Sequence, residues 1–159
     1  MKVLWTDGSA SPNPGPGGFA VIWQKEDGTA EPVVLGREDR STNIRMEGRA
    51  LMAAIQYAGE EGCEIHSDSE FWINVLKKWA PAWQRNEWHK AADRKVDKDG
   101  RFMGWKVSSI KNLDIVKELY ELYCTHPVEL VWEKGHVGTD LNELADKMAN
   151  KARKGYQLG

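Results

Sequence analysis

The spacing of hydrophobic residues changes once along this chain of 159 residues, and the change limits the possible folds more than any other feature. Before residue 43, short apolar runs at Val3–Thr6, Phe19–Trp23 and Glu31–Gly36 alternate with turn-forming residues such as Asp27-Gly28. This pattern predicts three antiparallel strands joined by short turns, with the Pro- and Gly-rich stretch Ser9–Gly18 as a loop.

After residue 43, apolar residues recur at the spacing of helices, interrupted by two short strand-like runs. The expected helices are Asn43–Gly59, Phe71–Trp79, Leu113–Cys124 and Leu141–Ala152, and the expected strands are Cys63–Ser67 and Val128–Trp132. A meander followed by strand–helix units predicts an α/β fold. Its mixed five-stranded sheet, antiparallel at first and then parallel, carries helices on both faces.

Charge is distributed unevenly along the chain. Residues 77–111 contain ten Lys/Arg and four Asp/Glu, a net charge of +6, and form an irregular basic segment in the predicted order. Since the whole chain has a net charge of −2, the remainder carries −8. The basic segment predicts a local anionic partner. The length and the 41% hydrophobic content fit one globular domain over residues 1–159, with 153–159 as a loose tail.

Neither secretion nor membrane insertion is expected. The N-terminus reaches Asp7-Gly8 too early for the apolar core of a signal peptide, and no run of 18 apolar residues occurs. The cysteines, Cys63 and Cys124, lack the spacing of metal-binding or redox pairs, which favours two reduced, buried thiols over a disulfide. We expect a cytoplasmic monomer without an obligate protein partner.

Four carboxylates fall at positions that the predicted fold brings together. Asp7 ends the first strand, Glu47 lies near the start of the first long helix, Asp68 ends the fourth strand and Asp146 lies inside the last helix. If the first and fourth strands are neighbours, Asp7 and Asp68 meet at one edge of the sheet. Clustered carboxylates repel one another unless cations neutralise them, and oxygen ligands favour hard divalent ions such as Mg²⁺. Two such ions about 4 Å apart can activate water and stabilise the leaving oxygen of a phosphodiester.

Each of these four residues also has an ordinary explanation. An Asp before Gly is commonly a turn residue, and an acidic residue in a helix commonly faces solvent. Asp68, which precedes Ser69, could simply cap a helix. The functional interpretation therefore depends on the four residues together.

Four motifs follow one another along the chain. They occupy residues 6–9 with 13–18, residues 42–47 with 50–55, residues 66–69, and residues 132–138 followed by Asn142, Glu143 and Asp146. In order and spacing they resemble the ribonuclease H family, specifically its bacterial type-1 class, from residue 3 to about residue 152. The resemblance implies a ribonuclease H-like fold and an endonuclease that hydrolyses the RNA strand of RNA–DNA hybrids, leaving 5′-phosphate and 3′-hydroxyl ends.

The resemblance also implies roles for the matching residues. The four carboxylates align with ligands of two Mg²⁺ ions, for which Mn²⁺ is a possible substitute, and His136 aligns with a catalytic loop histidine. Other residues align with contacts to the RNA strand, with a pocket for a DNA phosphate, and with an aromatic channel for the DNA strand. These are Asn13 and Asn43 for the RNA strand, Arg40, Thr42 and Asn112 for the phosphate pocket, and Phe71, Trp79 and Trp83 for the channel.

Residues 77–111 correspond to a basic protrusion that holds the hybrid in bacterial members of the family. Tryptophans alternate there with Lys and Arg, which suits contacts to phosphates and sugars. The sequence departs from the family in this region: residues 97–104 look like an insertion, and Ala82 stands where Asn is common. Ile44 likewise replaces a second Asn. These differences leave the carboxylates intact but alter the expected substrate contacts.

Two alternative functions remain compatible with the motifs. One is a module that binds hybrids without cleaving them. The other is a related nuclease or integrase that acts on DNA alone, or a ribonuclease H domain of a reverse transcriptase. The complete set of carboxylates with His136 favours catalysis, because clustered negative charge near phosphates weakens simple binding. The chain's own protrusion favours a free-standing enzyme.

Overall fold

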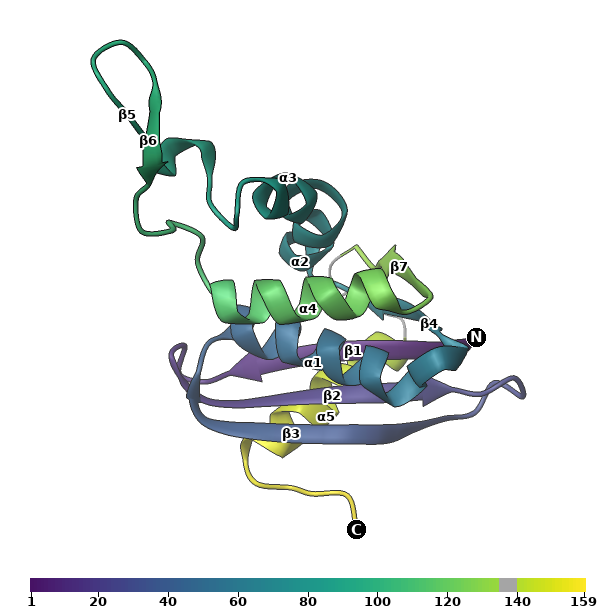
Figure 1. The fold of residues 1–159 in the computed structure, drawn as a ribbon. Coiled ribbons are helices and arrows are strands. Elements are labelled where there is room, and N and C mark those ends of the chain that lie inside the picture. The colour runs from purple at the N-terminus through teal and green to yellow at the C-terminus, as the bar shows by residue number, and fades with distance from the viewer. Residues whose placement is uncertain (135–139) are drawn as a thin grey trace.

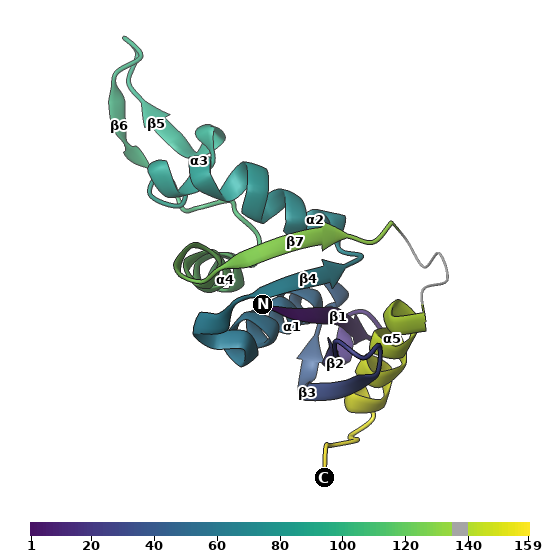
Figure 2. The same cartoon turned by 90° about the vertical axis from the view of Figure 1, so that its right-hand side faces the viewer.

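The computed structural model describes residues 1–134 and 140–159 (Figures 1 and 2). Its five-stranded sheet has the strand order β3-β2-β1-β4-β7. The strands β1 (Lys2–Ala10), β2 (Gly15–Gln24) and β3 (Ala30–Ser41) form an antiparallel meander. β4 (Cys63–Ser67) and β7 (Val128–Trp132) extend the sheet in parallel with β1. The predicted mixed sheet is confirmed.

Helices cover both faces of this sheet, as predicted. On one face lie α1 (Asn43–Ala58), α4 (Leu113–Thr125) and a helical stretch in three parts. The three parts are α2 (Glu70–Asn74), a π-helical turn (Val75–Trp79) and α3 (Ala80–Arg85). On the other face, α5 (Asp140–Arg153) packs against β1 and β2, and Figure 1 shows it behind the sheet.

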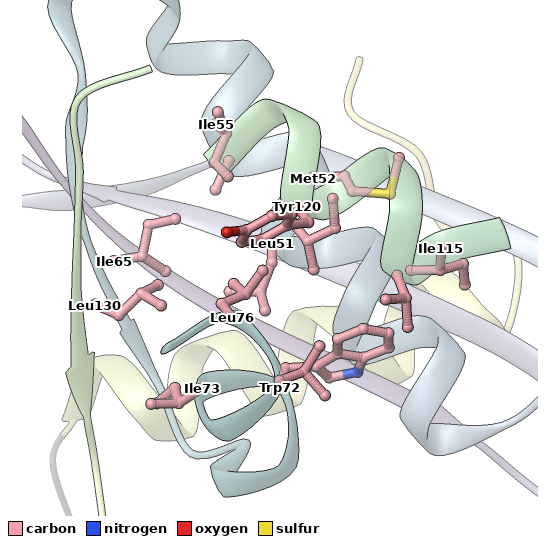
Figure 3. Packing of buried hydrophobic residues seen from close by; sticks show 14 of the residues in the cluster. Leu51, Met52, Ile55, Ile65, Trp72, Ile73, Leu76, Ile115, Tyr120 and Leu130 are labelled. Atoms are coloured by element: carbon pink, nitrogen blue, oxygen red, sulfur yellow. The ribbon is translucent and has the colours of Figure 1, made fainter. Parts of the chain in front are cut away.

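Two hydrophobic cores hold these layers together. The larger core lies between the sheet and the helices of the first face, where Leu51, Ile65 and Trp72 are fully buried (Figure 3). The smaller core packs Trp5 and two other sheet residues against one side of α5. Because hydrophobic residues of β1 alternate between the two cores, this strand is fixed from both faces, and so is Asp7, which lies within β1 rather than at its end as expected.

The basic segment 77–111 is more regular than predicted. The helix continues beyond Trp79 into α3, whose first turn contains Pro81, a position at which proline is tolerated. After a short 3₁₀ turn, β5 (Arg94–Val96) and β6 (Phe102–Trp105) pair as an antiparallel hairpin. The hairpin projects away from the body of the protein (Figure 1).

Two further expectations are corrected. The stretch Ser9–Gly18 is not a loop throughout, since β1 and β2 stay paired as far as Ala10 and Gly17, and only residues 11–14 connect them. Cys124 is exposed on α4 rather than buried, whereas Cys63 is buried as expected, and both are free thiols. Within the described residues, no helix is long and apolar enough to cross a membrane. α5 ends at Arg153, and residues 154–159 form neither helix nor strand.

Candidate active site

Three of the four predicted carboxylates form a compact cluster at the end of the sheet where β4 finishes. Asp7, Glu47 and Asp68 each offer one carboxylate oxygen, and these oxygens lie within 4.8 Å of one another. The parallel pairing of β1 with β4 brings Asp7 and Asp68 to the same edge, because Trp5 pairs with His66, two residues before each of them. Glu47 reaches the cluster from the beginning of α1.

Gly8 allows α1 to approach the strand that carries Asp7. A Cβ atom on Gly8 would lie 2.2 Å from the carbonyl carbon of Met46 and 2.3 Å from the backbone nitrogen of Glu47. Both contacts are with backbone atoms, which cannot turn aside as a flexible side chain could. Glycine at position 8 is therefore what places Glu47 beside Asp7.

Asp146 comes to the same edge from the opposite face of the sheet. Gly18 permits the close approach of α5, since a Cβ atom there would lie 2.4 Å from the carbonyl oxygen of Ala149. Asp146 is half-buried and shares a side-chain hydrogen bond with Asp7. Asn150, one turn further along α5, donates from Nδ2 to the carbonyl oxygen of Asp146 at 3.1 Å. The four predicted carboxylates are thus neighbours.

The cluster is strained electrostatically. Burial, together with the negative charges of Asp68 and Asp146, raises the pKa of Asp7 to about 9, although the backbone N–H of Gly8 donates to its Oδ1 at 2.9 Å. Burial, together with Asp68, also raises the pKa of Glu47 to about 7. Without a cation, the protein therefore holds a proton on Asp7 at neutral pH.

This donor set fits a divalent metal ion. All the donors are carboxylate oxygens, which hard divalent cations prefer, and three of them already lie within reach of one ion. A cation would also relieve the repulsion that raises the pKa of Asp7. Asp7, Glu47 and Asp68 could therefore hold a divalent ion, with Asp146 beside them.

The ordinary explanation of Asp68 as a helix cap does not apply. Ser69 caps α2 instead, because its Oγ accepts from the backbone N–H of Trp72 at 3.3 Å. The Ser69 side chain also hydrogen-bonds to Glu47, which lowers the pKa of that carboxyl against the effect of burial. Ser69 thus fixes the start of α2 and orients one of the clustered carboxylates.

The two asparagines expected to contact RNA lie next to each other. The backbone N–H of Asn43 donates to Oδ1 of Asn13 at 3.2 Å, and the backbone N–H of Ala10 donates to Oδ1 of Asn43 at 2.6 Å. These bonds tie the connection between β1 and β2 to the first residue of α1. Both asparagines therefore sit at the same edge of the sheet as the carboxylates.

A cavity of about 530 Å³ is lined by two of the three residues expected to bind a DNA phosphate. It is lined by Asn13, Thr42, Ile44, Lys111 and Asn112. Thr42 also caps α1, since its Oγ1 accepts from the backbone N–H of Arg45 at 3.2 Å. Arg40 is exposed on β3 and does not line this cavity, where Lys111 supplies the positive charge instead.

The three expected channel aromatics gather around an adjoining cavity of about 400 Å³. The ring centroids of Phe71 and Trp79 are 6.1 Å apart, and those of Trp79 and Trp83 are 6.0 Å apart. Lys90 and Lys111 also line this cavity, which shares Ile44, Lys111 and Asn112 with the cavity of about 530 Å³. Together the two cavities offer aromatic faces beside positive charge.

Some residues of the site were not predicted individually, and one predicted residue lies outside the described chain. Lys90 and Lys111 belong to the basic segment, so their charge was a usable signal. Ser69 and Asn150 gave no signal of their own, because their partners become apparent only when the helices are placed. His136 lies outside the described residues.

Comparisons with a family model and with curated proteins point to the same family. A family model described as RNase H matches residues 1–154. A ribonuclease H from Granulibacter bethesdensis is 34% identical over 152 residues, which are 94% of this chain and 90% of the relative. A ribonuclease H from Marinobacter nauticus is 37% identical over 153 residues, or 94% of this chain and 91% of the relative.

Solved structures share the fold at lower sequence identity. LC9-RNase H1, described as a type 1 RNase H with the type 2 active-site motif, has a TM-score of 0.71 at 22% identity, over 99% of this chain and 74% of that one. LC11-RNase H1, solved in complex with an RNA/DNA hybrid, has a TM-score of 0.64 at 20% identity, over 97% of both chains. With the family model matching almost its whole length, this chain belongs to the ribonuclease H family, which consists of endoribonucleases.

Proposed function

We propose that this protein hydrolyses the RNA strand of RNA–DNA hybrids, leaving 5′-phosphate and 3′-hydroxyl ends. The observation that carries the proposal is the gathering of four carboxylates from β1, α1, β4 and α5 beside two cavities that offer aromatic rings and lysines. The family membership and the hybrid bound to LC11-RNase H1 support the same substrate.

The proposed cofactors are two Mg²⁺ ions, with Mn²⁺ as a possible substitute. Asp7, Glu47, Asp68 and Asp146 would hold them. When bound, such ions activate water and stabilise the leaving oxygen of a phosphodiester. The all-oxygen donor set and the raised pKa of Asp7 support a cation at this position, because both describe a site that is short of positive charge.

The chain's own residues bind and orient the substrate. Lys90 and Lys111 would neutralise phosphates of the DNA strand, while Phe71, Trp79 and Trp83 pack against its sugars. Asn13 and Asn43 would contact the RNA strand near the cut. RNA is distinguished from DNA by its 2′-hydroxyl groups, so we expect little dependence on base sequence.

Three variants test the catalytic assignment. Asp7→Asn, Glu47→Gln and Asp68→Asn should each nearly abolish cleavage while leaving hybrid binding largely intact, because each removes a carboxylate that could bind a metal ion but preserves the shape of the side chain. Cleavage of labelled hybrid, double-stranded RNA and double-stranded DNA is measured with and without Mg²⁺, and hybrid binding by fluorescence anisotropy in EDTA. Near-normal turnover by any variant would remove that residue from the site.

The same assay separates the alternatives. A wild-type protein that binds hybrid but never cleaves it would be a binding module, and cleavage of double-stranded DNA alone would indicate a DNA nuclease. We further propose a cytoplasmic monomer, a proposal that the two free thiols support for a reducing compartment. Light scattering of the purified protein tests the monomer.

A further inference from the structure

The β5–β6 hairpin stands on a fixed base. The buried carboxylate of Asp93 accepts from the backbone N–H groups of Lys90 at 2.9 Å and Ser109 at 3.0 Å. The carbonyl oxygen of Asp93 accepts from the N–H of Lys106 at 2.7 Å. One residue thus joins the chain segments that enter and leave the hairpin. The projecting hairpin in Figure 1 is therefore a positioned arm rather than an unattached loop.

One face of the hairpin combines aromatic and apolar side chains with Arg94. Arg94 pairs with Trp105 and Val96 pairs with Phe102, with an irregularity between the two pairs. The rings of Phe102 and Trp105 meet edge to face, with centroids 5.2 Å apart. His89 stacks on Trp105 with ring centroids 4.7 Å apart and an interplanar angle of 6°. We name Arg94, Val96, Phe102 and Trp105 the hairpin face. Phe102 is 48% exposed and Val96 55% exposed, so this face lacks a full cover in the described protein.

The same hairpin is strongly basic. Residues 94–106 contain five Lys/Arg and two Asp. The Oδ1 atom of Asp97 is occupied within the turn, where it accepts from the N–H groups of Asp99 and Arg101, both at 2.9 Å. Lys95, Lys98 and Lys106 form no ion pair with any described residue. The hairpin therefore carries lysines without an ion pair among the described residues, and one exposed ring, that of Phe102, whose centroid lies 5.1 Å from the guanidinium carbon of Arg94.

This combination fits unpaired nucleotides better than a duplex. A duplex presents phosphates and sugar edges on its outside and keeps the faces of its bases stacked within. Phosphates alone would require the lysines but give no use to an exposed phenylalanine. An unpaired nucleotide offers both a phosphate and a free base face, which stacks on an aromatic ring beside positive charge.

The hairpin is also connected to the substrate cavities. The Nζ of Lys90 lies 5.8 Å from the ring centroid of Trp83, which lines the aromatic cavity, and the backbone of Lys90 is held by Asp93. Figure 1 places the hairpin on the same side of the protein as the first residues of α1 and α4. The hairpin therefore lies on the side of the protein towards which a strand leaving the cavities could extend.

We propose that the hairpin face binds single-stranded nucleic acid that continues from the end of the hybrid. This inference rests on the proposed function, because it assumes that a hybrid occupies the cavities. The ligand is an unpaired DNA or RNA strand, and the hairpin adds affinity for hybrids that have such a strand over hybrids with blunt ends.

The test compares hybrids by fluorescence anisotropy in EDTA, where cleavage does not occur. The probes are a blunt hybrid, the same hybrid with a DNA or an RNA tail of about ten nucleotides, which lies within the usual range of single-strand site sizes, and a blunt hybrid lengthened by as many base pairs. The test variant is Phe102→Ala, and the control is Val107→Ala, which trims an apolar side chain that is 93% exposed.

We expect wild type to bind a tailed hybrid about five- to tenfold more tightly than the blunt one, the scale of one stacked base. Phe102→Ala should lose this gain, and Val107→Ala should keep it. Turnover of the blunt hybrid in Mg²⁺ should be the same in all three proteins. A gain with either tail supports the inference, and the tail that gives it identifies DNA or RNA as the ligand.

Two results would overturn the inference. One is an equal affinity of wild type for tailed and blunt hybrids. The other is a loss of affinity in Phe102→Ala that is as large for the lengthened blunt hybrid as for the tailed hybrids. That result would mean that the hairpin contacts the backbone of a duplex. Failure of the proposed function looks different, since wild type would then leave the blunt hybrid uncleaved in Mg²⁺ whatever the tails show.

Discussion

Replacing Asp7 by Asn should stabilise the metal-free protein, and this gain should depend on pH. In the folded protein Asp7 has a pKa of about 9, against an ordinary value of 3.8. Between these values the folded state binds more protons at this position than the unfolded state does. The stability of wild type therefore falls as pH rises through this range, whereas Asn binds no proton and carries no such dependence.

The size of the effect follows from the two pKa values. Each pH unit between 3.8 and neutrality costs wild type about 1.4 kcal/mol, so the upper bound at pH 7 is about 4 kcal/mol. Asn keeps an Oδ1 that can accept from the N–H of Gly8, and its amide group can donate to Asp146 or Asp68. We expect a gain of about 2–4 kcal/mol at pH 7, or a rise in Tm of about 5–15 °C.

The assay is thermal and urea unfolding of both proteins in EDTA from pH 4.5 to pH 8. Asp114→Asn is a control of opposite sign, because the Arg45 guanidinium lowers the pKa of Asp114 to about 2. That pair stabilises the fold above the ordinary pKa of Asp and loses its effect as pH falls towards 2, and exposure keeps the effect small. An Asp7→Asn variant less stable than wild type at pH 7, or with a gain that does not change with pH, would refute the reasoning. Mg²⁺ should reduce the difference in stability between Asp7→Asn and wild type, because it should bind wild type more tightly than the variant.

Three further predictions concern the backbone approach, the basic segment and the loop histidine. Gly8→Ala should destabilise the fold by about 1–3 kcal/mol and weaken Mg²⁺ binding, because the added Cβ meets the backbone of Met46 and Glu47. Urea unfolding measures the stability and calorimetry measures the Mg²⁺ affinity. An unchanged stability and affinity would contradict the close packing. Replacing Lys90, Arg94 and Lys95 together by Gln should raise KM, leave kcat nearly unchanged and reduce the log–log salt slope by about 0.7–0.9 for each lost phosphate contact; an unchanged slope would make the segment a solvated surface. His136→Ala should lower kcat by about 10²-fold with a smaller change in KM, and a wild-type rate across pH 6–9 would exclude a catalytic role.

Elements with strong periodicity could be predicted closely from the sequence. The helix expected at Asn43–Gly59 runs from Asn43 to Ala58, and the strands expected at Cys63–Ser67 and Val128–Trp132 have those bounds. Each is bordered by a residue that stops it, such as Gly59 after α1. Local chemistry decides such boundaries, so one sequence suffices to place them.

The stretch Ser9–Gly18 shows where local chemistry is ambiguous. Its glycines and prolines predict a loop, yet Ser9 and Ala10 pair with Gly18 and Gly17 in the sheet. A glycine can provide either a turn or room for another backbone, and only the position of the helices decides between them. Gly18 provides room for α5, which follows more than a hundred residues later.

Within the site, the types of chemistry were predictable but many of the partners were not. The carboxylates could be assigned because the predicted order of strands brings their ends together. Ser69 and Asn150 contact Glu47 and Asp146 only after two helices have been placed, so no spacing in the sequence reveals them. The sequence does not indicate the hairpin for a related reason, since β5 and β6 are short and largely exposed, with no apolar alternation to predict their pairing.

The carboxylate cluster opposes folding, which makes it informative beyond its likeness to a family. A fold selected only for stability would not bury Asp7 beside three other carboxylates, because each pH unit between the ordinary pKa of 3.8 and about 9 lowers the stability of the fold. Yet Gly8 and Gly18 bring two helices close enough to complete the arrangement, and both glycines do so at backbone distances that admit no other residue. The close packing of both helices holds together carboxylates that repel one another. A cation that binds the carboxylates and removes this repulsion explains such packing. The pH-dependent gain of Asp7→Asn in EDTA therefore tests the functional site without any measurement of activity, and its narrowing in Mg²⁺ tests the ligand.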